Sequence, residues 1–454
     1  MDTVARNLAN YCVSINYDDL TPDVVHRTKL LLIDALACGF GGYNSKPAEI
    51  ARRLAGQVQQ SHHLATIMGS GQKSSLELAT FANGVMIRFL DFNDSYFGKE
   101  GGHPSDNFAP ILSCADSVHS CGREVIVASV LAYEVFCRIA DRITLGSKGW
   151  DHAITGVISS VIGVSKILGL SREQVVEAIN LVIAPNISLF QTRAGEISMW
   201  KGCALPNAAR NAVFAALLAK EGMTGPSPIF EGKYGLFNVV TGPFQLEKFG
   251  GDNRPFRIMD TMVKQYPCGT FAQTAIDAAL KLRNKITALD EIAYINIGTF
   301  TLGKIGMGTD LELWHPKTRE SADHSMPFAV AVSLMFGRLD LKHFSDEYLH
   351  NPDLLDLMSK ITVEETEECN TLYPNATANR VEITTKSGKK LSELVQYHRG
   401  HSKNFLTEEE IENKFYSLSD GLLPKDRSKK LISRLWNLED VDDIDEIMKM
   451  TQIG

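Results

Sequence analysis

The sequence has no run of about 18 consecutive apolar residues, the length that a helix needs to cross a bilayer. Its first residues, MDTVAR, show no basic stretch followed by an apolar one, so we expect no signal peptide. The eight cysteines are scattered, with no C-x-x-C pair and no iron–sulfur spacing. These absences predict a cytoplasmic protein with reduced thiols and no membrane span.

Signatures of nucleotide and metal sites are missing as well. There is no G-x-x-x-x-G-K-[ST], no G-x-G-x-x-G after an expected strand, no H-E-x-x-H and no EF-hand loop. Asp91, Asp94 and His103 are residue types that bind metals, but no wider ligand set accompanies them. We therefore expect no nucleotide, no metal and no other cofactor.

Positive charge is also in deficit, with a net charge of −8 and an isoelectric point near 5.9. This balance argues against nucleic acid or an anionic membrane as a partner. An acidic protein can still bind an acidic metabolite if the pocket is locally basic. The 454 residues, 44% hydrophobic and 22% charged, are typical of a globular protein and suggest two domains.

A helical pattern covers most of the chain. Residues 21–23, Thr-Pro-Asp, form a typical helix start, and this helix is expected to end at Gly39. Capping boxes begin further helices at Ser171 and Thr407. Abundant alanine and glycine in the first half indicate closely packed helices.

The pattern changes near residue 265. Residues 291–300, 361–365 and 379–385 are rich in β-formers, and residues 386–389 predict a hairpin turn. We therefore predict a mainly α fold with an α+β insertion. Its parts are a large all-helical domain, residues 1–262 and 398–454, and a smaller α+β lid domain, residues 263–397.

Residues 88–107, RFLDFNDSYFGKEGGHPSDN, concentrate titratable side chains between two apolar segments. They are Asp91, Asp94, Glu100, His103 and Asp106. A carboxylate and an imidazole in one pocket can shift each other's pKa toward the working pH, as acid–base catalysis requires. The alternative is a surface loop whose acids and histidine are merely solvated.

The same segment resembles the signature of the MmgE/PrpD family, which contains 2-methylcitrate dehydratase, cis-aconitate decarboxylase and iminodisuccinate epimerase. SMWKG with PNAARN, and P-x-T-R-E-x-A-D-H-S-x-P, resemble the family too, and the resemblance covers roughly residues 5 to 420. It implies a large helical domain with an α+β lid, a homodimer and no required metal.

The resemblance also implies roles for single residues. Asp91 and His103 would exchange protons with the substrate, while Lys201 and Lys264 would hold its carboxylates. Candidates for further substrate contacts are Asp94, His152, Tyr266 and Lys317.

Several of these residues have a structural alternative. Lys201 could extend its charge to solvent, Lys264 could lie in a solvated hinge, and His152 could follow an Asp151 helix cap.

For residues 314–327 we prefer a salt-linked helix start formed by Arg319, Asp323 and His324. The alternative is that Lys317, Arg319 or His324 contacts the substrate directly.

The LDFND and GHPSDN motifs look closest to the dehydratase members of the family. The predicted activity is therefore dehydration of a 2-methylcitrate-like hydroxy-tricarboxylate. Decarboxylation of cis-aconitate and epimerisation of an iminodisuccinate-type acid are the enzymatic alternatives. A non-catalytic protein that binds a di- or tricarboxylate is the alternative from another class.

Overall fold

The computed structural model describes residues 3–58, 60–195 and 197–453, and the chain divides into two compact units. Unit 1 consists of Met1–Thr192, Trp200–Thr261 and Thr407–Gly454. Unit 2 consists of Arg193–Met199 and Met262–Leu406. The predicted fold class, mainly helical with a smaller sheet-containing region, is confirmed.

Unit 1 is built from helices and two short hairpins. The helices are α1 (Thr3–Ser14), α2 (Pro22–Gly42), α3 (Lys46–Ala55), α4 (Leu76–Phe89), α5 (Phe108–Val118), α6 (Gly122–Ala140), α7 (Ala153–Ile167), α8 (Arg172–Ile183), α9 (Ala204–Lys220), α18 (Glu408–Ser419), α19 (Lys425–Trp436) and α20 (Ile444–Met450). The hairpins pair β1 (Leu64–Thr66) with β2 (Lys73–Ser75), and β3 (Tyr96–Phe97) with β4 (Gly101–Gly102).

Helix α7 is the central helix of unit 1 and packs against α1, α5, α6, α8 and α9. Apart from Lys166 in the last turn, its residues are apolar or small and buried on all sides, as a central helix requires. A Cβ on Gly156 would lie 2.7 Å from the Leu205 side chain, and one on Gly163 would lie 2.9 Å from that of Ile111. The glycines therefore allow the close helix packing that the composition predicted.

Helix α2 begins as predicted, with the Thr21 hydroxyl accepting the Val24 N–H and Pro22 in the first turn. The predicted end at Gly39 is wrong, because α2 continues to Gly42. A Cβ on Gly39 would collide with the Met68 side chain, so this glycine permits close packing and does not stop the helix. The capping boxes at Ser171 and Thr407 are confirmed.

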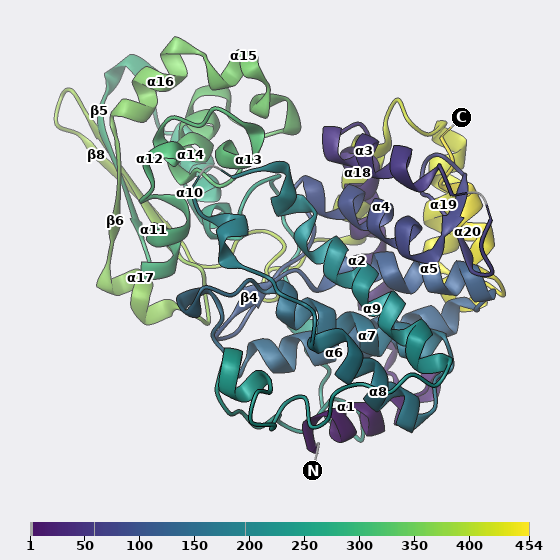
Figure 1. Cartoon of the computed structure of the whole chain (residues 1–454). Helices are drawn as coiled ribbons and strands as arrows, with labels where there is room; N and C mark the ends of the chain where they lie inside the picture. The colour runs from purple at the N-terminus through teal and green to yellow at the C-terminus, as the bar shows by residue number, and fades with distance from the viewer. Residues whose placement is uncertain (1–2, 59, 196, 454) are drawn as a thin grey trace. The chain divides into compact units, whose positions relative to one another are not determined.

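The two ends of the chain pack together in unit 1, where the yellow helices α18 and α19 lie against the purple α2 (Figure 1). Lys414 of α18 places its ammonium 2.6 Å from the Asp34 carboxylate of α2 and donates to the Phe92 carbonyl oxygen at 2.8 Å. Lys29 of α2 pairs with Glu439 at 2.9 Å. The C-terminal helices thus hold both α2 and the segment that follows α4.

Unit 2 is built around a four-stranded sheet with the order β6-β5-β7-β8. Strand β5 runs parallel to β6 and antiparallel to β7, which forms a hairpin with β8. The strands are β5 (Ile292–Thr299), β6 (Ile361–Glu365), β7 (Asn379–Thr385) and β8 (Lys390–Val395), so the predicted strands and hairpin are confirmed.

One face of this sheet is apolar and buried, with Ile295 and Ile297 of β5 paired in register with Ile383 and Val381 of β7. Figure 1 shows α10 and α14 on one side of the green sheet, and both pack against its strands. The helices of unit 2 are α10 (Gln273–Arg283), α11 (Thr301–Met307), α12 (Leu311–Trp314), α13 (Arg319–Ala322), α14 (Met326–Phe336), α15 (Asp346–Leu349), α16 (Pro352–Ser359) and α17 (Glu367–Leu372).

None of the helices in the described part of the chain combines the length and the apolar character that a membrane span requires.

Candidate active site

Asp91 lies just after α4 in a left-handed backbone conformation, with φ of 51°. Glycine normally takes this position at a helix end, because a Cβ makes the conformation costly. The Asp91 N–H donates to the Arg88 carbonyl oxygen at 3.2 Å, which closes the turn. A strained non-glycine residue in such a turn often marks a functional site.

The Asp91 carboxylate is bound by Arg88, whose Nη1 contacts Asp91 Oδ1. Arg88 Nη1 also donates to Asn93 Oδ1 at 3.4 Å, and Arg88 Nε lies 3.7 Å from Asp106 Oδ2. The Arg88 and Asp91 side chains are only 1% and 2% exposed. Because an unpaired buried charge is costly, each member of this pair stabilises the charged form of the other.

His103 is held through one ring nitrogen. Its Nδ1 lies 2.7 Å from the backbone carbonyl oxygen of Asp94. A carbonyl only accepts hydrogen bonds, so Nδ1 carries a hydrogen and Nε2 is the nitrogen that can exchange a proton. His103 Nε2 lies 3.7 Å from Asp91 Oδ1. Unit 1 thus brings together the two residues predicted to transfer protons.

Both carboxylate oxygens of Asp94 accept hydrogen bonds from the protein. Ser105 N–H donates to Oδ1 at 2.9 Å, and Tyr133 O–H donates to Oδ2 at 2.8 Å. Burial raises the pKa of Asp94 to about 6, although the bonds from Ser105 and Tyr133 act in the opposite direction. Asp94 therefore connects α6 to the turn that holds His103.

His152 directly precedes α7, and its ring centroid lies 5.6 Å from that of His103 at an interplanar angle of 67°. The side chain of the preceding Asp151 accepts the Ala153 N–H at 2.9 Å and caps the helix. His152 is thus placed beside His103, and the cap is formed by its neighbour.

Lys201 lies in a 3₁₀ turn, Met199–Gly202, and is only 3% exposed. A Cβ on Gly202 would lie 3.2 Å from the Phe89 Cα, so this turn packs on the end of α4. The turn that carries the buried Lys201 therefore lies against the end of the helix that leads to Asp91.

Several residues that support this arrangement were not predicted. Asn93 Nδ2 donates to Ser105 Oγ and to Asp106 Oδ1, both at 2.9 Å. The signal for Arg88 was its place at the head of the motif, and the signal for Tyr133 was a polar side chain inside the apolar α6. Neither signal identifies the partner.

In unit 2, Lys264 and Tyr266 lie on a loop that is fixed by Gln273 of α10. The Gln273 amide accepts from the N–H groups of Gln265 and Tyr266 at 3.2 and 3.1 Å, and donates to the carbonyls of Tyr266 and Cys268 at 2.9 and 3.1 Å. Lys264 is fully buried. The Tyr266 hydroxyl donates to Asp277 at 2.7 Å, within unit 2.

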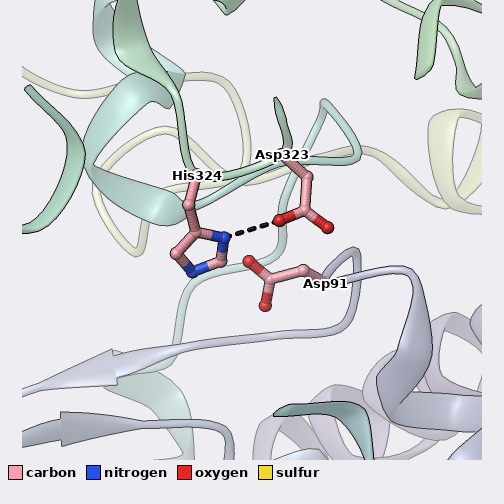
Figure 2. A group of neighbouring side chains, drawn as sticks. All are labelled: Asp91, Asp323 and His324. Atoms are coloured by element: carbon pink, nitrogen blue, oxygen red, sulfur yellow. Dashed lines mark hydrogen bonds and ion pairs between the residues drawn. The ribbon is translucent and has the colours of Figure 1, made fainter. Parts of the chain in front are cut away.

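The loop between α13 and α14 carries Asp323 and His324, and Figure 2 shows the bond between them. His324 Nδ1 lies 2.6 Å from Asp323 Oδ1. The Arg319 guanidinium lies 4.8 Å from the centre of the Phe344 ring, and Lys317 is exposed. This segment thus contains a histidine–carboxylate pair of its own.

Unit 1 combines a buried imidazole beside a carboxylate with a buried lysine, Lys201, and these groups are typical of an acid–base enzyme that acts on anions. Comparison with known proteins agrees with this class. The MmgE/PrpD N-terminal domain matches residues 6–248, and the MmgE/PrpD C-terminal domain matches residues 266–438. The chain belongs to the MmgE/PrpD family and is a lyase of that family.

Its relatives include two kinds of enzyme. The chain is 31% identical over 408 residues to 2-methylcitrate dehydratase of Cupriavidus necator, covering 82% of this chain and 81% of that protein. It is 28% identical over 425 residues to mitochondrial 2-methylcitrate dehydratase of Yarrowia lipolytica, covering 88% and 80%. It is 23% identical over 455 residues to cis-aconitate decarboxylase of Homo sapiens, covering 98% and 93%.

Proposed function

We propose that this protein is a hydro-lyase that dehydrates a 2-methylcitrate-like hydroxy-tricarboxylate without a metal or another cofactor. The observation that carries the proposal is the His103–Asp91 pair, in which Nδ1 is fixed and Nε2 is directed to a carboxylate at 3.7 Å. The similarity to 2-methylcitrate dehydratase of Cupriavidus necator supports the choice of substrate.

Dehydration requires removal of a proton from the carbon next to a carboxylate and departure of a hydroxyl group as water. The C–H electron pair forms the new double bond, while the C–O electron pair leaves with oxygen, which must be protonated. We assign both proton transfers, from the carbon and to the leaving hydroxyl, to His103 and Asp91. Lys201 and Lys264 hold the substrate carboxylates and stabilise the charge that develops.

The four residues predicted to contact the substrate differ in how well they are placed to do so. His152 lies beside His103 and is suited to contact the substrate. The Asp94 carboxylate and the Tyr266 hydroxyl are already hydrogen-bonded to other protein groups, which favours a positioning role for both residues. Lys317 is exposed and would bind substrate only as a solvated charge.

Decarboxylation of cis-aconitate is the second candidate function. The similarity to the human cis-aconitate decarboxylase, which covers 98% of this chain, favours it. Decarboxylation needs loss of CO₂ and protonation of the resulting carbanion, so the same lysines and proton donors would serve.

Incubation with 2-methylcitrate, citrate, cis-aconitate and a simple dicarboxylate in D₂O, followed by NMR, tests the proposal. Loss of water from 2-methylcitrate is the expected result. Loss of CO₂ from cis-aconitate alone would identify the decarboxylase, and deuterium incorporation without loss of either group would indicate an epimerase.

We further propose a cytoplasmic homodimer. Unit 1 has large apolar side chains exposed on and around α9, among them Ile187, Trp200 and Phe214, which are 74%, 49% and 54% exposed. Exposed apolar residues of this size favour burial against another subunit. Sedimentation at micromolar concentration should give twice the chain mass, and Phe214→Asp should shift it toward the monomer.

A further inference from the structure

Unit 1 contains a cavity of about 380 Å³ between the end of α1, the beginning of α6 and the end of α7. Its lining residues include Cys12, Tyr17, Arg123, Val127, Ser165 and Lys166. Ser165 and Lys166 lie in the last turn of α7, whereas His152 directly precedes the first residue of this helix. The 15 residues of α7 span about 22 Å, so the cavity and His152 lie at opposite ends of one helix. Sites for small molecules typically measure about 300–1,000 Å³, and this cavity falls within that range.

Ser165 brings a buried hydroxyl to the cavity. Its side chain belongs to a residue that is only 1% exposed, and the hydroxyl makes no hydrogen bond within the described part of the chain. Two other buried serines of α7, Ser159 and Ser160, both donate to Asn107 Oδ1, at 3.1 and 2.7 Å. A buried hydroxyl without a partner is costly. Because Ser165 lines the cavity, a bound molecule can supply the missing partner.

Two cations reach the same cavity and are held by backbone carbonyls. Lys166 Nζ donates to the Ile15 carbonyl oxygen at 2.7 Å, which uses one of the three N–H groups of the ammonium. Arg123 Nε donates to the Glu439 carbonyl oxygen at 3.3 Å, and its guanidinium lies 5.0 Å from the centre of the Tyr17 ring. Among the described residues, no protein group accepts from the two terminal nitrogens of Arg123. Both side chains are therefore fixed in place and keep donors for an anion.

The charges that line the cavity favour an anion. They are the two cations, Arg123 and Lys166, and one carboxylate, Glu124. Glu124 accepts the Cys121 N–H at 3.3 Å in the capping box that begins α6, where the positive end of the helix dipole stabilises its charge. In a protein with a net charge of −8, this is a locally basic cavity.

The rest of the lining is apolar and buried. Val127 and Leu170 are 3% and 6% exposed. Cys12 is equally buried, and its thiol donates to the Ile162 carbonyl oxygen at 3.5 Å. Burial raises the pKa of Cys12 to about 12, although Lys166 acts in the opposite direction, so the thiol stays neutral. A ligand for this cavity therefore needs an apolar part as well as a negative charge.

We propose that this cavity is a second binding site, specific for a small organic carboxylate with a short apolar tail. Arg123 and Lys166 bind the carboxylate, Ser165 donates a hydrogen bond to it, and the tail packs on Val127, Leu170 and the Cys12 thiol. The proposal is independent of the proposed dehydration, because it uses no residue of the candidate active site.

Saturation-transfer NMR of the whole protein tests the site, with hexanoate as the probe. Hexanol and hexylamine have the same tail without the negative charge and should bind at least about tenfold more weakly. Arg123→Gln and Lys166→Met should each weaken hexanoate binding by about tenfold, the usual weight of a hydrogen bond to a charged group. Arg53→Gln removes an exposed arginine of α3 and is the matched control.

The Ser165 hydroxyl is tested by Ser165→Ala. Hexanoate binding should weaken by about threefold or more, whereas the melting temperature without ligand should stay equal or rise, because the hydroxyl has no protein partner to lose. A lower melting temperature would show that the hydroxyl is already bonded and would contradict its role as a ligand donor.

A carboxylate can also bind at the candidate active site, and two measurements separate the sites. Lys201→Ala should keep hexanoate affinity within about twofold, and Arg123→Gln and Lys166→Met should keep kcat and KM for 2-methylcitrate within about twofold. Hexanoate binding that is lost in Lys201→Ala but kept in the two cavity variants would place the probe in the active site and overturn the proposal. Equal binding of hexanoate, hexanol and hexylamine, or no binding of hexanoate to the wild type, would overturn it as well. If 2-methylcitrate is not dehydrated, the proposed function fails while the binding test of this cavity still stands.

Discussion

His103 in unit 1 and His324 in unit 2 are both anchored through Nδ1, but to different acceptors. The carbonyl of Asp94 holds His103 at 2.7 Å, and the carboxylate of Asp323 holds His324 at 2.6 Å. A neutral acceptor fixes a ring without favouring its charged form, whereas an anionic one stabilises the imidazolium. The difference teaches that one residue type can meet a carboxylate through either ring nitrogen: Asp91 lies 3.7 Å from His103 Nε2, whereas Asp323 lies 2.6 Å from His324 Nδ1.

The largest expected effect comes from breaking the unit 1 pair. His103→Ala and Asp91→Asn should each lower kcat by a factor of about 10²–10⁴ while substrate still binds, because ground-state binding rests on the lysines. The two losses should be non-additive, because removing the second member of a proton relay lowers kcat little once the first is gone. Steady-state kinetics and ligand titration of both singles and the double measure this. Losses that simply multiply would contradict a joint role.

The next largest effect is expected from removing the buried lysine of either unit. Lys201→Ala and Lys264→Ala should each raise KM and lower kcat, at a cost of about 2–4 kcal/mol in transition-state binding. Lys99→Ala, an exposed lysine beside the motif, is the matched control. Wild-type kinetics in either buried-lysine variant would remove that lysine from the site.

A smaller effect concerns stability and tests how His103 is held. The folded-state pKa of Asp94, about 6, lies above its ordinary value of 3.8, so folding favours the protonated form. This contribution is complete below about pH 3.8 and is lost as the pH rises through 6. Asp94→Asn should therefore gain stability relative to wild type over this window, by up to about 3 kcal/mol. Urea midpoints at pH 4.5, 5.5 and 6.5 measure it, and a constant difference would be contrary to the burial argument.

The corresponding support in unit 2 is the amide of Gln273. Gln273→Met keeps the volume but removes the bonds to the loop of Lys264, and it should cost about 1–3 kcal/mol of stability. The KM should rise and kcat should fall, in the same direction as for Lys264→Ala, because the loop positions that lysine. Denaturant unfolding with parallel kinetics measures both, with the exposed Lys386→Met as control.

The smallest expected effect is none at all. Prolonged treatment with EDTA should leave activity unchanged, because the proposed chemistry uses side-chain proton donors and ammonium groups alone. Activity that disappears on chelation and returns with one divalent metal would overturn this scheme for both units.

Much of this architecture follows from local sequence. The strands at 361–365 and 379–385 and the capping boxes were predicted because alternation and end signals act over a few residues. Residues 88–107 were predicted as a site because their polar groups are adjacent in the chain. The end of α2 was mispredicted because Gly39 serves to leave room for the side chain of a distant residue, Met68, and does not end the helix.

The parts that sequence did not provide depend on contacts between distant residues. Tyr133 meets Asp94 across 39 positions, and nothing in either segment specifies that bond. The acceptor on His103 could not be predicted either, because it is a backbone carbonyl and every residue has one. The link between Asp323 and His324 was expected, because the two residues are adjacent in the sequence, and the structure adds its length of 2.6 Å.

The return of the C-terminal helices to unit 1 has a consequence for synthesis on the ribosome. Lys414 anchors Asp34 and the Phe92 carbonyl, so unit 1 cannot complete its core until nearly the whole chain has emerged. At roughly 5–20 residues per second, the N-terminal helices wait tens of seconds for that partner. Unit 2, which closes at Leu406, is complete earlier although it begins later. The nascent chain therefore exposes the apolar face of α2 longest, and this is where we expect a chaperone to bind.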